Sequence, residues 1–356
     1  MSLLAPAAPS DFTLIGHAQQ RGDAWLPRQR VIGGQSNFYP GAIPVADVER
    51  RLFGWKGERR RIAVERPAQW NEEPSHVGVD GVPSVWDAID SRVAITRDDS
   101  GDNTVFGVVS QKYEIHQYRD WLLRDVANLL DDSLSISSAG YLRHGALAWV
   151  EISVPANVRV ARGVTFRPNL LATSSMDGTS ATIFKRTVTD VVCDNTRRVA
   201  LKEDGEELRV RHTKGSGFRI ASAREALDLV YEARDVFAAQ IEELLATPVS
   251  DAQWGEFLKV LVPEGTRTGK PDSEHRAMEK ARQRAELDRL YRTDSRCGQW
   301  HGTAHGALQA VNTYEHHVLA PRQRERGARN AEWTVDGEFD RRDKRHYADL
   351  VRLLEG

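Results

Sequence analysis

The pair Asp177-Gly178 lies between two long runs of β-forming residues, and it is the feature that most constrains the fold. Asp-Gly is one of the strongest hairpin signals, because it fits the tight turns that join two antiparallel strands. The flanking runs, residues 166–176 and 179–192, are rich in Thr, Val, Ile and Phe, which strands favour. The sequence therefore predicts a long, projecting β-hairpin over residues 166–192.

Further β-rich runs precede this hairpin and predict an antiparallel sheet. Residues 92–97 and 104–110 flank the turn-forming stretch Asp-Asp-Ser-Gly-Asp-Asn, and residues 134–138 and 146–154 follow them. Between these runs, residues 117–131 carry apolar side chains at helical spacing. We therefore expect one helix packed on the sheet.

Weaker patterns fill the first part of the chain. Residues 1–45 are rich in Gly, Pro, Gln and Ser and predict an irregular arm. Residues 44–54 predict a short helix and residues 55–65 an extended segment, whereas residues 66–88 contain three prolines and predict a loop.

The last third of the chain predicts helices. Their expected ranges are residues 220–246, 251–261, 273–291, 302–319 and 346–354. Ser250 or Asp251 can cap the second of these helices, and residues 320–342 predict an Arg-rich loop. The predicted fold class is α+β, with an N-terminal arm and a small helix/strand segment over residues 1–90. A sheet-rich core with the hairpin over residues 91–219 and a helical region over residues 220–356 follow.

Charge and cysteine content limit the function classes. The chain has 49 Lys and Arg against 51 Asp and Glu, a formal net charge of -2, so no global positive field draws it to nucleic acid. Its two cysteines form no disulfide framework, and its first residues lack the basic and apolar segments of a signal peptide. No apolar run is as long as a membrane span. We expect a soluble, cytoplasmic protein.

The strongest candidate site is a basic stretch around the predicted hairpin. Residues 156–220 contain 12 Lys and Arg against 7 Asp and Glu, and four of these acids fall within residues 203–207. The candidate DNA-binding residues are Arg167, Lys185, Arg186, Arg197, Arg198, Lys202, Arg209, Arg211, Lys214 and Phe184. Cations can follow the phosphates of a single strand while aromatic rings stack on its bases.

The competing interpretation is a solvated sheet face with the Phe side chains in the core. Side chains alternate along a strand, so Lys185 and Arg186 reach one groove only if the strand twists or bulges. The acidic turn at 203–207 could also cover the basic face in a resting state.

Other chemistries are weaker. Residues 265–271 resemble a phosphate-binding loop, but one spacer residue is missing and Pro271 stands at the position of the metal-binding hydroxyl. Cys297, His301 and His305 are spaced to share one helix face and could hold Zn²⁺, although a helix start with polar histidines explains them better. We predict no metal and no cofactor.

A nucleophilic site is also conceivable but has little support. Ser174, Ser175 and Asp177 lie near a turn, with His144 or His212 as a possible base, yet Ser and Asp are also ordinary turn residues. Cys193 ends an apolar run and is expected to be a buried thiol. We therefore name no catalytic residue.

Several motifs resemble a phage/plasmid-like family catalogued as domain of unknown function 932. They include residues 107–117, 174–196, 211–213 and 302–317, and the resemblance extends from about residue 20 to residue 318. The family pattern falls on Asp177, Gly178, Ser180, Cys193, Asn195, Thr196, Arg211, His212 and Thr213. In that family an aromatic residue is usual at the position of His305, which weakens the metal interpretation.

The resemblance implies a sheet and long helices similar to the single-strand annealing recombinases of the RecT and Red-beta class, a likeness of fold. It implies an ATP-independent, non-catalytic protein of phage or plasmid origin that binds and anneals single-stranded DNA in recombination or replication. A homo-oligomeric ring or filament would present the strand. The alternatives are an enzyme with a hydrolase-like or metal-dependent site near Asp177, Asp194 and His212, or a phage protein that binds a host factor.

Overall fold

The computed structural model describes most of the chain. The described residues are 12–16, 31–32, 35–99, 104–124, 134–153, 158–190, 195–197, 207–214, 237–265, 271–319, 329–330, 333 and 338–356. Several predicted features lie outside them, namely Cys193, Asp194, Arg198, Lys202, residues 203–206 of the acidic turn, the second half of the 117–131 helix and residues 220–236 of the next predicted helix.

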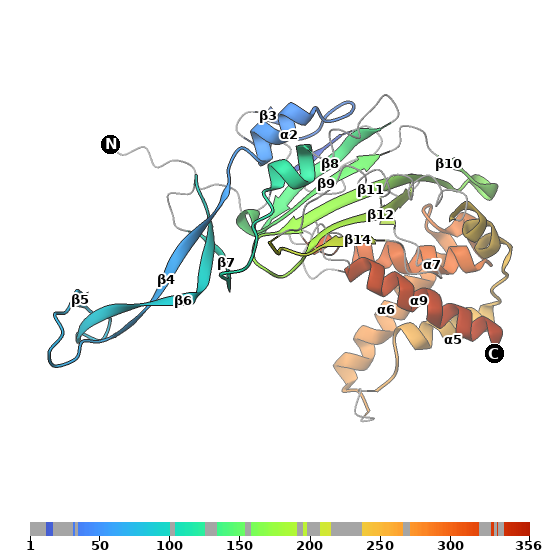
Figure 1. Cartoon of the computed structure of the whole chain (residues 1–356). Helices are drawn as coiled ribbons and strands as arrows, with labels where there is room; N and C mark the ends of the chain where they lie inside the picture. The colour runs from blue at the N-terminus through green and yellow to red at the C-terminus, as the bar shows by residue number, and fades with distance from the viewer. Residues whose placement is uncertain are drawn as a thin grey trace.

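An antiparallel sheet of eight strands forms the centre of the molecule (Figure 1). Its order is β1-β8-β9-β11-β12-β13, with β10 also pairing with β11 and β14 with β12. The strands are β1 Phe12–Ile15, β8 Ser135–Leu142, β9 Leu147–Ser153, β10 Val158–Arg159, β11 Thr165–Ser175, β12 Thr182–Asp190, β13 Asn195–Arg197 and β14 Glu207–Val210. Part of the predicted irregular arm, residues 12–15, is thus a buried strand.

The hairpin of β11 and β12 is confirmed, but it does not project. The two strands pair in one unbroken register from Phe166↔Asp190 to Thr173↔Ile183. On its other side β11 pairs with β9 from Asn169 to Ser175, so β11 is an inner strand. The connecting turn has a positive φ at Gly178, where a side chain would be strained. Within that turn, the backbone N–H of Thr179 donates to the Asp177 carboxylate at 2.9 Å.

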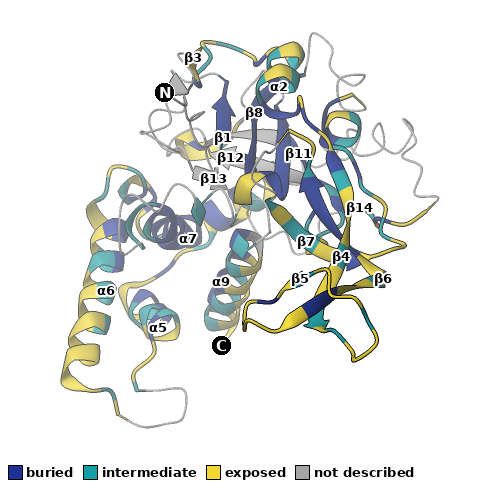
Figure 2. Ribbon diagram, turned by 90° about the vertical axis from the view of Figure 1, so that its left-hand side faces the viewer, coloured by how far each residue is buried: buried dark blue, intermediate teal, exposed yellow. Residues whose placement is uncertain are grey.

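The element that projects is a second antiparallel sheet, at the left of Figure 1. It contains β4 Gly57–Pro67, β5 His76–Val77, β6 Pro83–Arg97 and β7 Val105–Ser110, in the order β4-β6-β5 with β7 also on β6. We call residues 57–97 the arm. It is a different segment from the irregular N-terminal arm that the sequence predicts over residues 1–45. Much of it is exposed, as the yellow ribbon of Figure 2 shows.

The prediction of a loop over residues 66–88 was wrong. The tip is a loop, but β4 ends at Pro67 and β6 already begins at Pro83. Proline is tolerated at the ends of strands, where its missing N–H breaks no ladder, so these prolines bound the tip instead of excluding strands. Strand β6 crosses residue 90, and the arm and β7 therefore belong to one sheet across the predicted region boundary.

Two short helical segments cover the main sheet near the arm. Helix α2, Val45–Leu52, buries Val48 and Leu52 as predicted from its spacing. A π-helical segment, η2 Arg119–Arg124, is the described part of the predicted 117–131 helix and buries Leu122 and Leu123. These side chains join the apolar face of the sheet and the base of the arm in one core.

Four short elements complete this part of the chain. They are β2 Val31–Ile32, β3 Gln35–Ser36, η3 Arg143–Gly145 and η4 Ala161–Gly163.

Helices are concentrated in the C-terminal part, as an α+β class requires. They are α5 Asp251–Leu261, α6 Glu274–Thr293, η5 Gly298–Trp300, α7 Ala304–Thr313, η6 Tyr314–Val318 and α9 Glu338–Glu355. Ser250 caps α5 in a capping box with Gln253, as its sequence predicted. Helix α9 begins eight residues earlier than predicted, inside the expected Arg-rich loop.

Helix α7 is the buried centre of this region and appears dark blue in Figure 2. The long helix α6 shows an exposed outer face beside it. Helices α5, α6, α7 and α9 share one hydrophobic core. In the part of the chain that the structure describes, no helix has the length and apolar character that crossing a membrane requires.

Candidate functional site: a buried ring stack and a basic junction

Four rings stack in sequence where the arm joins the main sheet. Tyr113 stacks on His212 with ring centroids 4.7 Å apart, His212 on His116 at 4.0 Å, and His116 on Trp121 at 3.7 Å. The rings come from the segment after β7 and from the segment after β14. An isolated antiparallel bridge between Tyr113 and Thr213 holds these two segments together.

Burial keeps both histidines of the stack neutral. Loss of water contact, with a smaller effect of neighbouring His212, lowers the pKa of His116 to about 3. Burial also lowers the pKa of His212, although the carbonyls of Glu114 and Ser180 and the charge of Asp177 oppose this shift. The Nδ1 atom of His212 lies 2.9 Å from the Glu114 carbonyl, so that nitrogen carries the proton.

The Asp177-Gly178 turn packs directly against this stack region. A Cβ atom on Gly107 of β7 would lie 2.6 Å from the Asp177 carbonyl oxygen, so the two backbones touch. The Asp177 carboxylate is nearly buried and lies 3.5 Å from the Arg143 guanidinium. The turn and the two stacked segments, which are far apart in sequence, therefore meet at one place.

The structure describes only some of the predicted DNA-binding residues, and their grouping on one surface stays a prediction. Arg209, Arg211 and Lys214 are exposed. Lys185 and Arg186 occupy successive positions of β12, whose pairing with β11 shows no bulge. Arg167 pairs with Thr189, and Arg197 pairs with Val188.

Phe184 is a correction to the predicted stacking residues. Its side chain is only 1% exposed and belongs to the core beneath the main sheet. It is therefore closed to a nucleic-acid base. The burial of Phe184 agrees with the competing interpretation, in which the Phe side chains lie in the core.

Five exposed cations, which the sequence revealed only in part, lie in the segments at the base of the arm. We call Arg61, Arg92, Lys112, Arg211 and Lys214 the junction patch. All five are exposed, and none forms an ion pair or a side-chain hydrogen bond with another described residue. Backbone pairings bring their segments together, because Arg61 pairs with Val93 and Arg92 with Ser110, while the Tyr113–Thr213 bridge places Lys112 opposite Lys214. Arg61 shares a face of the sheet with Val93, so it lies on the opposite face from Arg92.

The sequence analysis identified Arg211 and Lys214 of this patch and missed the other three. Nearby acids are few. Glu114 faces Arg59 at 3.6 Å, and Asp90 is the exposed acid closest to Arg92 along β6. Lys112 is placed by the bridge between residues 113 and 213, and Arg61 and Arg92 by the strand pairings of β6. No local sequence pattern shows either kind of contact.

One family matches the chain. The sequence model of the family described as "Domain of unknown function (DUF932)" matches residues 105–342. The chain is a DUF932 protein. No curated protein and no solved structure matches it. The matched range contains the ring stack and three of the five patch residues, whereas the arm lies N-terminal to it.

The residues of the DUF932 resemblance converge only in part. Asp177, Gly178, Ser180, His212 and Thr213 lie around the ring stack. Asn195 and Thr196 instead stand in β13, opposite Asp190 and Thr189. The family motifs therefore mark the packing of the turn against the stack, and β13 is a separate edge of the same sheet.

The stack region contains a hydrogen-bonded chain that resembles part of a catalytic relay. Nδ1 of His116 lies 2.7 Å from the Thr182 hydroxyl, which lies 2.8 Å from the Ser174 hydroxyl. All three side chains have no exposed surface. A substrate could not reach the buried Ser174. These hydrogen bonds therefore stabilise the Asp177-Gly178 turn of the DUF932 domain.

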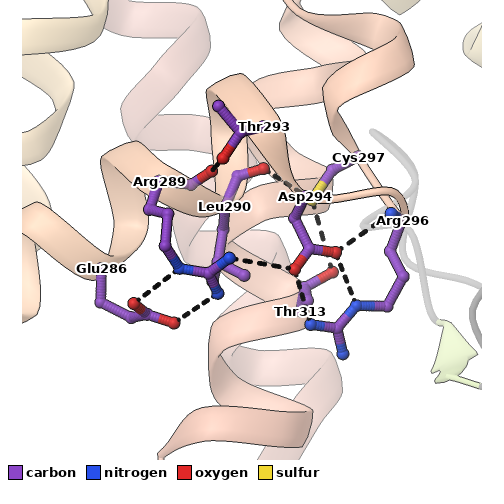
Figure 3. A network of polar contacts seen from close by, with 8 residues as sticks. All are labelled: Glu286, Arg289, Leu290, Thr293, Asp294, Arg296, Cys297 and Thr313. Carbon is purple, nitrogen blue, oxygen red and sulfur yellow. Dashed lines mark hydrogen bonds and ion pairs between the residues drawn. The ribbon is translucent and has the colours of Figure 1, made fainter.

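The spacing of Cys297, His301 and His305 does not place them on one helix. Cys297 precedes the short η5 segment, and α7 begins only at Ala304. Figure 3 shows the Cys297 thiol donating to the Leu290 carbonyl at 3.1 Å, beside Asp294 and its arginine partners. Across the described ranges, no group of three or more His, Cys, Asp or Glu side chains could hold a metal ion.

The network in Figure 3 instead stabilises the end of α6. The Asp294 carboxylate accepts from Arg296 at 2.7 Å and lies 3.5 Å from Arg289, which also pairs with Glu286. Hydrogen bonding from Arg296 lowers the pKa of Asp294 to about 2. Glycines at 298 and 302 end the helical path that the metal hypothesis needed, because Gly302 adopts a positive φ.

Proposed function

We propose that this DUF932 protein binds single-stranded DNA through the junction patch and anneals it to a complementary strand without ATP. The observation that carries the proposal is the set of five exposed cations at the base of the arm, none of which has an ion-pair partner among the residues that the structure describes. Exposed cations attract the phosphates of a nucleic acid, since binding releases condensed counterions from the strand. The net charge of -2 makes such a local patch necessary.

Exposed aromatic rings support a single strand over a duplex. Trp86 lies on β6, the same strand as Arg92, and it is exposed, as is Trp70 at the tip of the arm. Trp86 stacks on His76 with centroids 4.7 Å apart, which holds its ring in place. Unpaired bases can stack on such a ring, whereas the bases of a duplex are already stacked on one another.

The test is fluorescence anisotropy with a labelled single-stranded oligonucleotide at two salt concentrations, with a duplex of equal length for comparison. We expect binding to the single strand that weakens steeply with salt, and weaker binding to the duplex. Faster pairing of two complementary strands in the absence of ATP would support the annealing role. Absence of binding at low salt contradicts the proposal and favours the alternative, a phage protein that binds a host factor.

A catalytic site around Asp177, Asp194 and His212 is the second candidate. It is favoured by the proximity of Asp177 to His212, whose proton affinity Asp177 raises. Such a hydrolase-like enzyme would cleave the labelled strand in the presence of a divalent metal. Asp177→Ala would then abolish the cleavage and leave the DNA affinity intact.

A further inference from the structure

Strand β4 of the arm has one edge without a neighbouring strand among the residues that the structure describes. Its described pairing partner is β6 alone, and β5 and β7 both pair with β6. The open edge is eleven residues long, from Gly57 to Pro67. Long exposed edges are ready templates for another strand, and proteins usually shorten or cover them.

The open edge is also regular. Between Arg61 and Ala63 the register with β6 shifts, because β4 advances by two residues while its partners move from Val93 to Ala88. The extra residues are therefore on β6, and β4 continues without an insertion. A regular strand can form a full ladder with a neighbour, which a bulged strand cannot.

The arm gains little stability from its own packing. Val64, Trp70, Val77, Val79, Val82 and Trp86 are exposed apolar residues along it. A two-stranded ribbon exposed on both faces is marginal in water, and a third or fourth strand stabilises it. A partner strand on β4 would convert the ribbon into a wider sheet.

The charges of β4 are complementary to those of a second β4. We propose that two copies of this chain pair through β4, antiparallel, about a two-fold axis at Ile62. In this register Glu58 opposes Arg66 of the partner copy, and Arg59 opposes its Glu65. The symmetry makes each pair occur twice, as an isologous interface requires.

Other registers of this symmetric pairing are worse. A two-fold axis perpendicular to the sheet keeps every side chain on its own face, and directly opposite residues must share a face. The register can therefore shift only by two residues at a time, which moves the axis from one residue to the next. An axis at Arg61 places that arginine opposite its own copy. An axis at Ala63 places Arg60 opposite Arg66 of the other copy, whereas the axis at Ile62 places no like charges directly opposite each other.

The four charges are accessible for such contacts. Glu58, Arg59, Glu65 and Arg66 are all partly exposed, with 25–45% of their side-chain surface open. Each already has an intramolecular partner, and the second copy adds another opposite charge. The assembly is a closed dimer, which differs from the ring or filament expected by analogy with recombinases. It rests on the arm and shares Arg61 with the junction patch, but its test reads the oligomeric state of the protein without DNA.

The test uses charge reversal of one pair, read by analytical ultracentrifugation of the full chain. We expect the wild type to be a dimer. Arg59→Glu places two glutamates opposite each other, and Glu65→Arg places two arginines opposite each other. Each single variant should raise the dimer dissociation constant by more than about tenfold, because like charges at one position repel.

Mixing the two single variants provides the decisive result. In the mixed dimer both contacts again join opposite charges, so an equimolar mixture should form a heterodimer although each variant alone is monomeric. The double variant R59E/E65R should form homodimers. Recovery in the mixture also shows that both variants fold. A monomeric wild type, or an oligomer that neither reversal weakens, overturns the proposal.

Discussion

His116 links the buried ring stack to the acid stability of the protein. Its imidazole lies between Trp121 and His212 and has no exposed surface. Because burial lowers its pKa to about 3 from the usual 6.5, the folded protein resists protonation that the unfolded chain accepts. Between these two pKa values the unfolded state binds more protons, so stability falls as the pH falls.

The variant His116→Phe keeps a flat ring in the stack and removes the titration. For the wild type we expect a loss of up to about 1.4 kcal/mol per pH unit from this histidine below its unfolded pKa, with His212 adding in the same direction. The variant should be less stable at neutral pH, because the bond to Thr182 is lost, but its stability should depend less on pH. Guanidinium unfolding at about pH 7.5 and about pH 5, followed by tryptophan fluorescence, measures both effects.

His275→Phe is the matched control, because His275 is exposed on α6. Its stability at about pH 7.5 should differ from that of the wild type by less than about 0.5 kcal/mol, because its side chain is exposed. An equal pH dependence in His116→Phe and the wild type would show that His116 titrates normally in the folded protein.

At the scale of elements, the sequence predicted those helices and strands that are determined by interactions between residues close together in the chain. The β11–β12 hairpin, α2 and the capped start of α5 follow from turn residues, helical spacing and a cap within a few positions. The inner place of β11 could not be predicted, because it depends on pairing with β9 across the sheet. The arm was missed in part, because Pro67 and Pro83 look like loop residues until the pairing of β4 with β6 is known.

The candidate site was harder to predict for the same reason. Arg211, Lys214 and the motif residues Asp177 and His212 were identified from the sequence. Their meeting with Tyr113 and His116 depends on contacts between segments about a hundred residues apart. Phe184 could not be assigned to groove or core from composition, since the choice depends on which face of the sheet is covered.

Helix α9 is attached to the end of α7 by a buried ionic contact. Glu315 of η6 is 5% exposed, and its carboxylate lies 3.1 Å from both Arg342 and His346 of α9. Burial opposes the charged form, but the hydrogen bond from His346 and the charge of Arg342 outweigh it and lower the pKa of Glu315. The contact therefore stabilises the fold while Glu315 is ionised.

Glu315→Gln should destabilise the protein by about 2 kcal/mol at neutral pH, because Arg342 and His346 lose their anionic partner in a buried site. The difference from the wild type should be constant above the usual Glu pKa of 4.5 and should shrink as the pH falls through the lower native value. Thermal unfolding at several pH values measures it. Glu279→Gln on the exposed face of α6 is the control and should change stability by less than about 0.5 kcal/mol.

At the scale of the whole molecule, the main sheet, the arm and the C-terminal helices have separate tasks. The ring stack fixes the arm to the main sheet, and the junction patch lies where the two meet. The arm extends from the molecule with an open strand edge (Figure 1). In the proposed account, the arm joins two copies and the patch of each copy holds one strand of DNA.

The most direct test of DNA binding by the patch is the slope of log affinity against log salt for a single-stranded oligonucleotide. The variant Arg211→Gln/Lys214→Gln removes two patch cations. The control Arg282→Gln/Arg345→Gln removes two cations on α6 and α9 that are equally exposed. We predict that the patch variant binds more weakly and that its slope is shallower by about 1.4, since each phosphate contact contributes about 0.7 for a single strand. The control should keep the wild-type affinity and slope. Equal slopes for both variants and the wild type would contradict DNA binding through the junction patch.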